Sequence, residues 1–159
     1  MSAIFESAID TASHEQILAH LAASDADFVA DLGTRVNLPE YARKIATQST
    51  RVEAWHGGEL IGLVALYAND SSTRVAFVTH VSVAVAHHGR GIGRALLVDA
   101  MALAATRGMA RVDLEVATGN ARARRLYRAL GFLEVREDGG TTIMSRALDP
   151  ELEQHDDRA

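Results

Sequence analysis

Hydrophobic and polar residues alternate along the chain with two distinct periods. Between residues 14 and 23, Ile17, Leu18 and Leu21 recur with the spacing of an amphipathic helix. Ser13, directly before this segment, is a typical N-cap. Residues 75–85 form a valine-rich run that is typical of a strand. Applied to the whole chain, the pattern predicts helices over 14–23, 39–46, 93–107 and 121–130, and strands over 5–9, 51–56, 60–68, 75–85, 111–116, 132–136 and 141–147.

The order of these elements predicts a mixed sheet with helices on its faces. From residue 75 to residue 136 the chain runs strand, helix, strand, helix, strand, and such units usually place parallel strands side by side. Turns at residues 57–59 and 138–140 instead predict antiparallel hairpins. We therefore expect an α+β domain with a mixed, mostly antiparallel sheet of about six or seven strands. This domain is expected to cover residues 1–148, followed by a polar, mobile tail over 149–159.

Composition restricts the class of protein. The 159 residues suffice for one domain with a sizeable core, and hydrophobic and charged fractions of 48% and 23% are typical of globular proteins. The net charge of −5 argues against binding to nucleic acid, which favours a basic surface. The absence of cysteine excludes disulfides, thiolate metal ligands and cysteine nucleophiles. The sequence shows no zinc-site spacing, membrane span or signal peptide, so we expect a cytoplasmic protein without a metal.

One glycine-rich stretch, AHHGRGIGRALL over residues 86–97, lies between the valine-rich strand and a predicted helix. Gly89, Gly91 and Gly93 allow successive backbone N–H groups to converge, and the dipole of the following helix adds partial positive charge. Such a place binds phosphate. The dinucleotide fingerprint is absent because Arg94 stands where its third glycine would be, and the Walker pattern is absent too. From this stretch alone, a phosphate site and a plain connector both stay open.

Two signatures in the second half of the chain resemble those of the GNAT superfamily of acyl-CoA-dependent N-acetyltransferases. The first, [Gln/Arg]-x-x-Gly-x-[Gly/Ala], corresponds to residues 88–93, with His88 in place of the usual Arg or Gln. The second, Asn-x-x-Ala-x-x-Leu-Tyr-x-x-Leu-Gly-Phe, is matched by Asn120, Ala123, Leu126, Tyr127, Leu130, Gly131 and Phe132. Both signatures occur in the family's order and at the family's spacing.

The resemblance implies acetyl-CoA as the cosubstrate. Its pyrophosphate is expected on the backbone amides of the glycine turn, and its pantetheine arm on main-chain groups of Val83 and Val85, as an added strand would lie. Because backbone N–H groups form the cradle, His88 leaves that cradle intact. The residues that the resemblance assigns to the coenzyme are Val83, Val85, His88, Gly89, Arg90, Gly91, Ile92, Gly93, Arg94, Asn120 and Tyr127.

Direct transfer to an amine needs a base, a donor for the oxyanion and an acid for the departing thiolate. Tyr127 is predicted as the acid, because helical spacing places it on one face with Asn120. A tyrosine that only packs is the alternative. Glu115 is predicted as the base, since this segment resembles the ribosomal-protein alanine N-acetyltransferases, whose catalytic glutamate occupies the same strand position. A structurally paired carboxylate is the alternative, and Asp113, on the same side of the strand, is a lesser candidate.

His80 is a second candidate for the base, because an imidazole has a suitable pKa and this strand runs beside the expected coenzyme arm. A core histidine bonded to the backbone is the alternative. His80, Tyr67 and Asn69 are also predicted to meet the substrate, the last two because they share one strand face. Residues 25–46, whose pattern is ambiguous over 25–37, are expected to contribute to acceptor choice. A solvated basic face is predicted for Arg122, Arg124, Arg125 and Arg128.

Together these features predict an enzyme that moves an acetyl group from acetyl-CoA to an amine within a ternary complex. The acceptor is expected to be a small-molecule amine or a protein N-terminus, and the resemblance implies a homodimer. Neither nucleic acid nor a membrane is expected as a partner. A non-catalytic acyl-CoA sensor or scaffold is the alternative. Tyr127 favours the enzyme, since a protein that only binds the coenzyme needs no phenol beside the sulfur.

Overall fold

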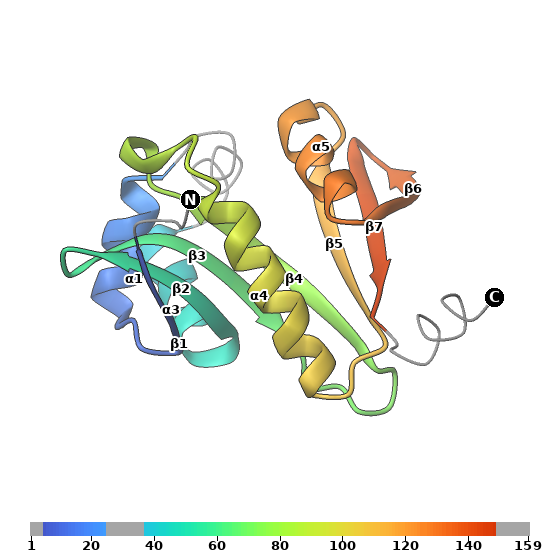
Figure 1. Ribbon diagram of the computed structural model, residues 1–159, viewed down its shortest axis with the longest axis horizontal. Coiled ribbons are helices and arrows are strands. Elements are labelled where there is room, and N and C mark those ends of the chain that lie inside the picture. Colours follow the sequence, from blue (N-terminus) through green and yellow to red (C-terminus); the bar gives the residue numbers. More distant parts are fainter. Residues whose placement is uncertain (1–4, 25–36, 149–159) are drawn as a thin grey trace. The chain divides into compact units, whose positions relative to one another are not determined.

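The computed structural model describes residues 5–24 and 37–148 of the chain. Strands and helices follow one another along the sequence, as Figure 1 shows. In chain order the described elements are β1 (Glu6–Ile9), α1 (His14–Ala22), α3 (Leu38–Gln48), β2 (Thr50–His56), β3 (Glu59–Tyr67), β4 (Val75–Val83), the short 3-10 helix η1 (Val85–His87), α4 (Ile92–Thr106), β5 (Arg111–Ala117), α5 (Ala121–Ala129), β6 (Leu133–Asp138) and β7 (Thr141–Ala147).

The ends of the predicted helices and strands agree with the structure to within two residues, and local capping explains much of this. The side chain of Ser13 accepts a hydrogen bond from the N–H of Gln16, whose own side chain accepts from the N–H of Ser13, which forms a capping box. Asn37 caps α3 by accepting from the N–H of Glu40 at 3.1 Å. The tail expected over 149–159 and the ambiguous residues 25–36 lie outside the described residues. None of the helices described is both long and apolar enough to span a bilayer.

Hydrogen bonds join seven strands in the order β1-β2-β3-β4-β5-β7-β6. β4 and β5 are parallel, whereas the pairs β1–β2, β2–β3, β5–β7 and β6–β7 are antiparallel. This mixed, mostly antiparallel sheet confirms the predicted α+β class. The prediction that β5, α5 and β6 form parallel neighbours was wrong, because β7 lies between the two strands. Thr142 and Met144 of β7 are buried, whereas β6 is exposed along its whole length, so the strand with buried side chains takes the inner place.

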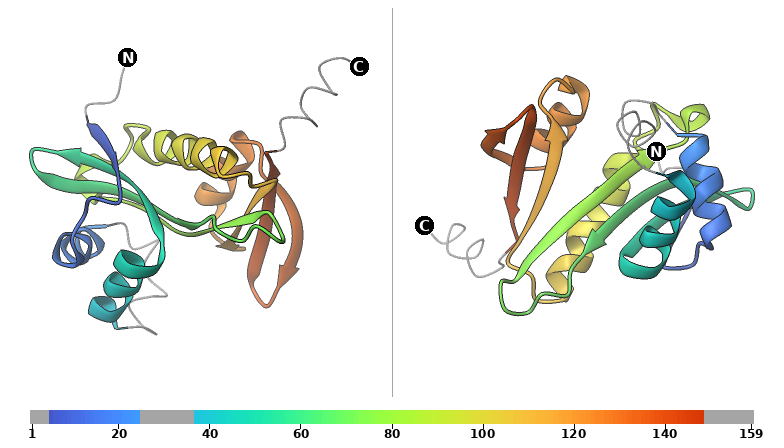
Figure 2. Two further views of the ribbon diagram at one scale, coloured as in Figure 1. Left: turned by 90° about the horizontal axis from the view of Figure 1, so that it is seen from below. Right: turned by 180° about the vertical axis from the view of Figure 1, so that it is seen from behind.

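The chain divides into two compact units, of which the first comprises Met1–Leu66 and Thr79–Ala100 and the second Tyr67–Val78 and Met101–Ala159. In the first unit, α1 and α3 lie on one side of strands β2 to β4 and the beginning of α4 lies on the other (Figure 2). A Cβ at Gly62 of β3 would lie 2.8 Å from Ile92 Cγ2, so glycine permits the close approach of α4. The core on the side of α1 and α3 consists of Ala12, Ile17, Leu21, Ala42, Ile45, Leu60, Leu63 and Ala65.

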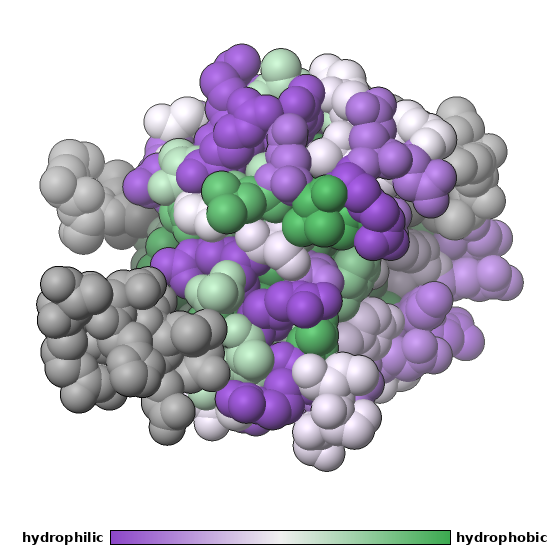
Figure 3. All heavy atoms as spheres, turned by 90° about the vertical axis from the view of Figure 1, so that its right-hand side faces the viewer, coloured by the Kyte–Doolittle hydropathy of each residue, from purple (hydrophilic) through white to green (hydrophobic). Residues whose placement is uncertain are grey.

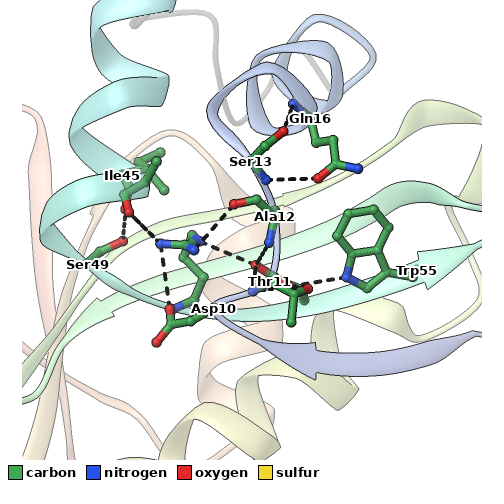
Figure 4. A network of polar contacts seen from close by, with 11 residues as sticks. Asp10, Thr11, Ala12, Ser13, Gln16, Ile45, Ser49 and Trp55 are labelled. Carbon is green, nitrogen blue, oxygen red and sulfur yellow. Dashed lines mark hydrogen bonds and ion pairs between the residues drawn. The ribbon is translucent and has the colours of Figure 1, made fainter.

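A buried ion pair between Arg51 and Glu53 fixes both helices of this core to β2, and Figure 4 shows residues of the surrounding network, among them Thr11, Ala12 and Ile45. Glu53 is fully enclosed, and its carboxylate accepts from the N–H groups of Thr11 and Ala12 at 3.1 and 2.9 Å. Arg51, on the same face of β2, donates to Glu53 at 3.3 Å and to the carbonyl of Ala46 at 2.8 Å. Burial raises the pKa of the Glu53 carboxyl, but the hydrogen bonds that it accepts outweigh burial and leave the pKa below its usual value. The pair thus connects the start of α1 and the end of α3 to one strand.

In the second unit, β6 forms the open edge of the sheet. Leu133 and Val135 on this strand are 72% and 57% exposed. Hydrophobic residues on the face drawn in Figure 3 are interrupted by hydrophilic ones. Arg124 and Arg128 of α5 both donate hydrogen bonds to Glu134 of β6, Arg124 at 2.7 Å. These contacts hold α5 against the edge strand.

Candidate active site

Among the described residues, the edge of β4 that faces away from β3 lacks a strand partner from the end of its ladder with β5 to the bridge between Ala84 and Ser24; we call this stretch the open edge. The ladder between β4 and β5 ends at Val78, whereas β4 continues to Val83. Directly after the strand, the N–H of Ala84 donates to the carbonyl of Ile61 on β3 at 2.8 Å. Because main-chain groups point alternately to the two edges of a strand, those of Val83 and Val81 point away from β3. This edge therefore offers the main-chain groups of Val81 and the N–H of Val83 to an extended ligand, whereas the carbonyl of Val83 already lies 3.0 Å from Nε2 of His88.

After β4 the chain turns into η1 and does not continue as a strand to residue 85. The N–H of Val85 donates to the carbonyl of Ala23 at 2.9 Å, and the carbonyl of Val85 accepts from the N–H of His88 at 3.2 Å. Both main-chain groups of Val85 are therefore engaged, which leaves the expected pairing of Val85 with the pantetheine arm without a free donor. A valine-rich pattern could not reveal this, because Ala23 lies far away in the sequence.

The main chain of residues 89–94 presents a row of N–H groups that are unused within the described part of the chain. Gly89 and Gly91 have φ angles of +78° and +74°, which residues with a side chain rarely adopt. The first main-chain bond of α4 runs from Ala95 to Gly91 at 3.0 Å, so the preceding amides have no partner within the helix. Nothing in the described part of the chain accepts from them either. A Cβ at Gly89 or Gly91 would meet no atom within 4 Å, so the turn faces open space. This arrangement fits a diphosphate.

The side chains around the turn have separate partners. Nε2 of His88 lies 3.0 Å from the carbonyl oxygen of Val83, and Nη1 of Arg90 lies 3.4 Å from Nδ1 of His87. The side chains of the two adjacent histidines therefore diverge. Arg90 and Arg94 are exposed beside the turn. Their guanidinium groups add positive charge close to the unused amides.

Tyr127 lies in the second unit on the buried face of α5. The residue is 4% exposed, and its ring makes an edge-to-face contact with Phe132, with the ring centroids 5.9 Å apart. Burial raises the pKa of the Tyr127 phenol. Among the described residues, the Tyr127 hydroxyl has no hydrogen-bond partner. Every fully buried polar side-chain atom in this part of the chain does have one, so the hydroxyl oxygen is not fully buried and reaches the surface. A buried phenol with an accessible tip is suited to donate a proton to a ligand.

Asn120 begins the helix that carries Tyr127. Its Oδ1 accepts from the N–H of Ala123 at 3.1 Å, which makes it the N-cap of α5. The structure thus gives Asn120 a local role that accounts for its place in the second signature. The contact with the coenzyme that the resemblance implied stays a prediction.

Glu115 lies on the outward face of β5. Val112, Leu114 and Val116 are buried, whereas Glu115 is exposed and Asp113 is half-buried on the opposite face. The shared face of the two carboxylates confirms the predicted alternation. Asp113 accepts hydrogen bonds from Arg111, at 3.0 Å, and from the hydroxyl of Ser145, so its carboxylate is already engaged. Glu115 is thus better placed than Asp113 to act on a substrate.

His80 belongs to a buried chain of hydrogen bonds that links α3, β4 and α1. Tyr41 Oη lies 3.1 Å from His80 Nδ1, and His80 Nε2 lies 2.8 Å from Ser82 Oγ. Ser82 Oγ lies 2.8 Å from His20 Nε2, and His20 Nδ1 lies 3.0 Å from the carbonyl of Leu60. Because the carbonyl can only accept, each group in turn donates to the next from Tyr41 to Leu60, with both histidines neutral.

Because this network of hydrogen bonds is buried, His80 is a weaker candidate for the base. Burial lowers the pKa of His80 to about 3, helped by the nearby His20, and burial lowers the pKa of His20 to about 4. The geometry therefore favours a core histidine, although its partners are side chains and not the backbone. Sequence reasoning missed Tyr41, Ser82 and His20, since their separation gives no motif. The alternation of His80 and Ser82 on one strand face was the only available signal.

The two neutral histidines predict a loss of stability in mild acid. In the unfolded chain each imidazole has its ordinary pKa of 6.5, whereas the folded values are about 4 for His20 and about 3 for His80. Below pH 6.5 the unfolded chain therefore binds more protons, and stability falls as the pH decreases toward the folded values. We expect each histidine to lower the free energy of unfolding by roughly 1 kcal/mol per pH unit.

Urea unfolding between about pH 7 and about pH 5 measures this slope, and His20→Gln is expected to reduce it by about half. A stability that does not change over this range contradicts the assignment of two neutral histidines.

Other predicted residues lie elsewhere. Tyr67 is the last residue of β3, and Asn69 lies beyond it in the connection to β4, so the two do not share a strand face. The connection that contains Asn69 leads into the first residue of β4, whereas the glycine turn comes after the last residue of β4. Arg122, Arg125 and Arg128 are exposed as predicted, whereas Arg124 is partly buried. Arg124 and Arg128 also bind Glu134.

The turn and the helix with Tyr127 lie within one stretch that matches a known protein family. A model of the acetyltransferase (GNAT) family matches residues 13–132. The chain belongs to the GNAT family. Streptothricin acetyltransferase of Streptomyces lavendulae is 36% identical over 87 residues, which cover 55% of this chain and 46% of that protein. The chain spans less than half the length of the curated GNAT relatives that it matches.

Solved structures share the GNAT fold over most of the chain. The ribosomal-protein-S18-alanine N-acetyltransferase from Escherichia coli has a TM-score of 0.71 at 19% identity, covering 90% of this chain and 94% of its own. The PaiA N-acetyltransferase from Thermoplasma acidophilum, solved in complex with coenzyme A, also has a TM-score of 0.71, at 18% identity, covering 89% and 99%. At these identities the likeness concerns the fold.

Proposed function

We propose that this GNAT protein is an N-acetyltransferase that moves an acetyl group from acetyl-CoA to an amine. The observation that carries the proposal is the row of unused N–H groups over residues 89–94, at the start of a helix of 15 residues. Membership of the GNAT family supports it, as does coenzyme A in the Thermoplasma acidophilum structure.

Acetyl-CoA supplies an acyl group activated as a thioester, and the residues that would hold it lie in the first unit. The amides of residues 89–94 would take the diphosphate, with Arg90 and Arg94 adding positive charge beside them. The main-chain N–H of Val83 on the open edge of β4 would donate to a carbonyl of the pantetheine arm, because the carbonyl of Val83 already accepts from His88. Most of these contacts use the backbone, which explains how His88 is compatible with the first signature.

Glu115 and Tyr127 carry the proton transfers of this proposal. An amine with a pKa near 10 is protonated at neutral pH, so Glu115, or a water that it orders, takes the proton before the nitrogen attacks the thioester carbon. Tyr127 holds a proton on its phenol oxygen at all ordinary pH values and gives it to the departing sulfur. Because the chain contains no cysteine, no thiol of its own takes the acyl group, and the amine attacks directly.

The acceptor is proposed to be a small-molecule amine or a protein N-terminus. One relative is named for the small molecule streptothricin, and one neighbour in fold is named for the alanine of a ribosomal protein. A panel of small amines and N-terminal peptides, followed by release of the free thiol of coenzyme A, tests both classes. We expect turnover in one class, and a rise in the melting temperature with acetyl-CoA.

The outcomes of this panel separate the alternatives. Coenzyme binding without turnover across the panel favours a non-catalytic acyl-CoA sensor. A melting temperature that rises with ATP or NAD but not with acetyl-CoA contradicts the choice of coenzyme.

The role of Glu115 can be tested against the neighbouring carboxylate. We expect Glu115→Gln to lower kcat about 10- to 100-fold, because water replaces an exposed base only in part. Asp113→Asn is the matched comparison, and its effect is expected to be small because that carboxylate already binds Arg111. Steady-state kinetics at saturating acetyl-CoA measures both variants. Equal losses in the two would contradict a specific role for Glu115.

A further inference from the structure

His88 stands at the boundary between fixed and unused main-chain amides. Before it, the N–H groups of Ala84, Val85 and His87 donate to carbonyls within the first unit, and the N–H of His88 donates to Val85. After it, the amides of residues 89–94 find no acceptor in the described part of the chain. The position of the unused amides is therefore set by the residue that precedes them.

The His88 side chain ties this boundary back to β4. Its Nε2 lies 3.0 Å from the carbonyl oxygen of Val83, and a carbonyl can only accept, so Nε2 carries the hydrogen. Val83 is the last residue of β4, and its main chain points to the open edge. The bond spans the short helix η1 and closes the segment from 83 to 88 into a loop. One imidazole thus connects the strand edge to the start of the diphosphate cradle.

We propose that His88 is a positioning residue that sets the spacing between the glycine turn and the open edge of β4. This inference rests on the proposed function, in which the turn holds the diphosphate and the edge holds the pantetheine arm. Coenzyme A is one molecule that must satisfy both places at once. A change in their spacing weakens the binding of the whole coenzyme, whereas a ligand that occupies the turn alone is little affected.

Two amide substitutions distinguish this role from a general effect on the fold. His88→Gln keeps an N–H donor at the position of Nε2. His88→Asn places its amide at the position of Nδ1, because the asparagine side chain is too short to reach the carbonyl of Val83. We expect His88→Asn to raise the Kd for coenzyme A about three- to tenfold, as expected for the loss of one hydrogen bond, and His88→Gln to restore it. The Kd for ADP, which has the diphosphate but no pantetheine arm, is expected to stay unchanged in both variants.

Isothermal titration calorimetry with coenzyme A and with ADP measures these constants, and His14→Asn is the matched control. His14 makes the same kind of bond, from Nε2 to the carbonyl of Pro39 at 2.9 Å, but joins α1 to α3 away from the turn. Its loss is expected to leave both constants unchanged.

Three results would overturn the inference: an unchanged Kd for coenzyme A in His88→Asn, equal weakening of coenzyme A and ADP, or failure of His88→Gln to restore binding. A wild-type protein that does not bind coenzyme A overturns the proposed function itself. Because the wild type is measured first, the two failures are distinguishable.

Discussion

Replacing Glu53 with alanine is expected to lower the free energy of unfolding by about 3–5 kcal/mol. The carboxylate is fully enclosed and accepts hydrogen bonds from main-chain and side-chain donors, among them Nε1 of Trp55 at 3.2 Å. Its removal leaves the buried guanidinium of Arg51 without its closest carboxylate and the N–H groups of Thr11 and Ala12 without an acceptor. The start of α1 then loses its attachment to β2. Urea unfolding at neutral pH measures the change.

The matched control for this variant is Glu59→Ala on the neighbouring strand. Glu59 is exposed at the start of β3, so its loss is expected to change stability by less than about 0.5 kcal/mol. The double variant Arg51→Met, Glu53→Leu removes both charges and is expected to be more stable than Glu53→Ala alone. A Glu53→Ala protein as stable as the Glu59→Ala protein would show that the ion pair does not hold the helices.

Replacing Tyr127 with phenylalanine is expected to lower kcat about 100- to 1000-fold, the range of a lost general acid. The substitution removes one oxygen and keeps the ring, so the edge contact with Phe132 is retained. The hydroxyl has no protein partner among the described residues, so its loss leaves no donor or acceptor of the chain unpaired. Stability and the Kd for coenzyme A are therefore expected to stay close to those of the wild type.

Steady-state kinetics with an acceptor from the panel gives kcat, while calorimetry and thermal unfolding give the two controls. A kcat equal to that of the wild type would remove Tyr127 from the role of acid. A loss of coenzyme affinity equal to the loss of kcat would instead make it a binding residue.

Local signals explain what could be predicted from the sequence. Ser13 and Asn37 cap their helices through side chains three residues from the amides that they bind, so short-range patterns suffice. Gly89 and Gly91 were recognised because positive φ angles restrict those positions to glycine in most proteins. The second signature placed Tyr127 on the buried face of α5, where the spacing of a helix alone brings it.

Contacts between residues that are distant in the sequence explain the features that could not be predicted. The N–H of Val85 is engaged by Ala23, which ends the strand early, and neither residue signals the other in the sequence. The same holds for His20, Tyr41 and His80, whose network turns a candidate base into a buried, neutral group.

By itself, the sequence determined the order and ends of the helices and strands, the glycine turn and the family, because each depends on residues close together along the chain. Only the tertiary structure decided the place of β7 between β5 and β6, and the partners of His88 and Glu53. These depend on which surfaces are buried together and which buried polar groups find a partner, and both are settled only when remote segments meet.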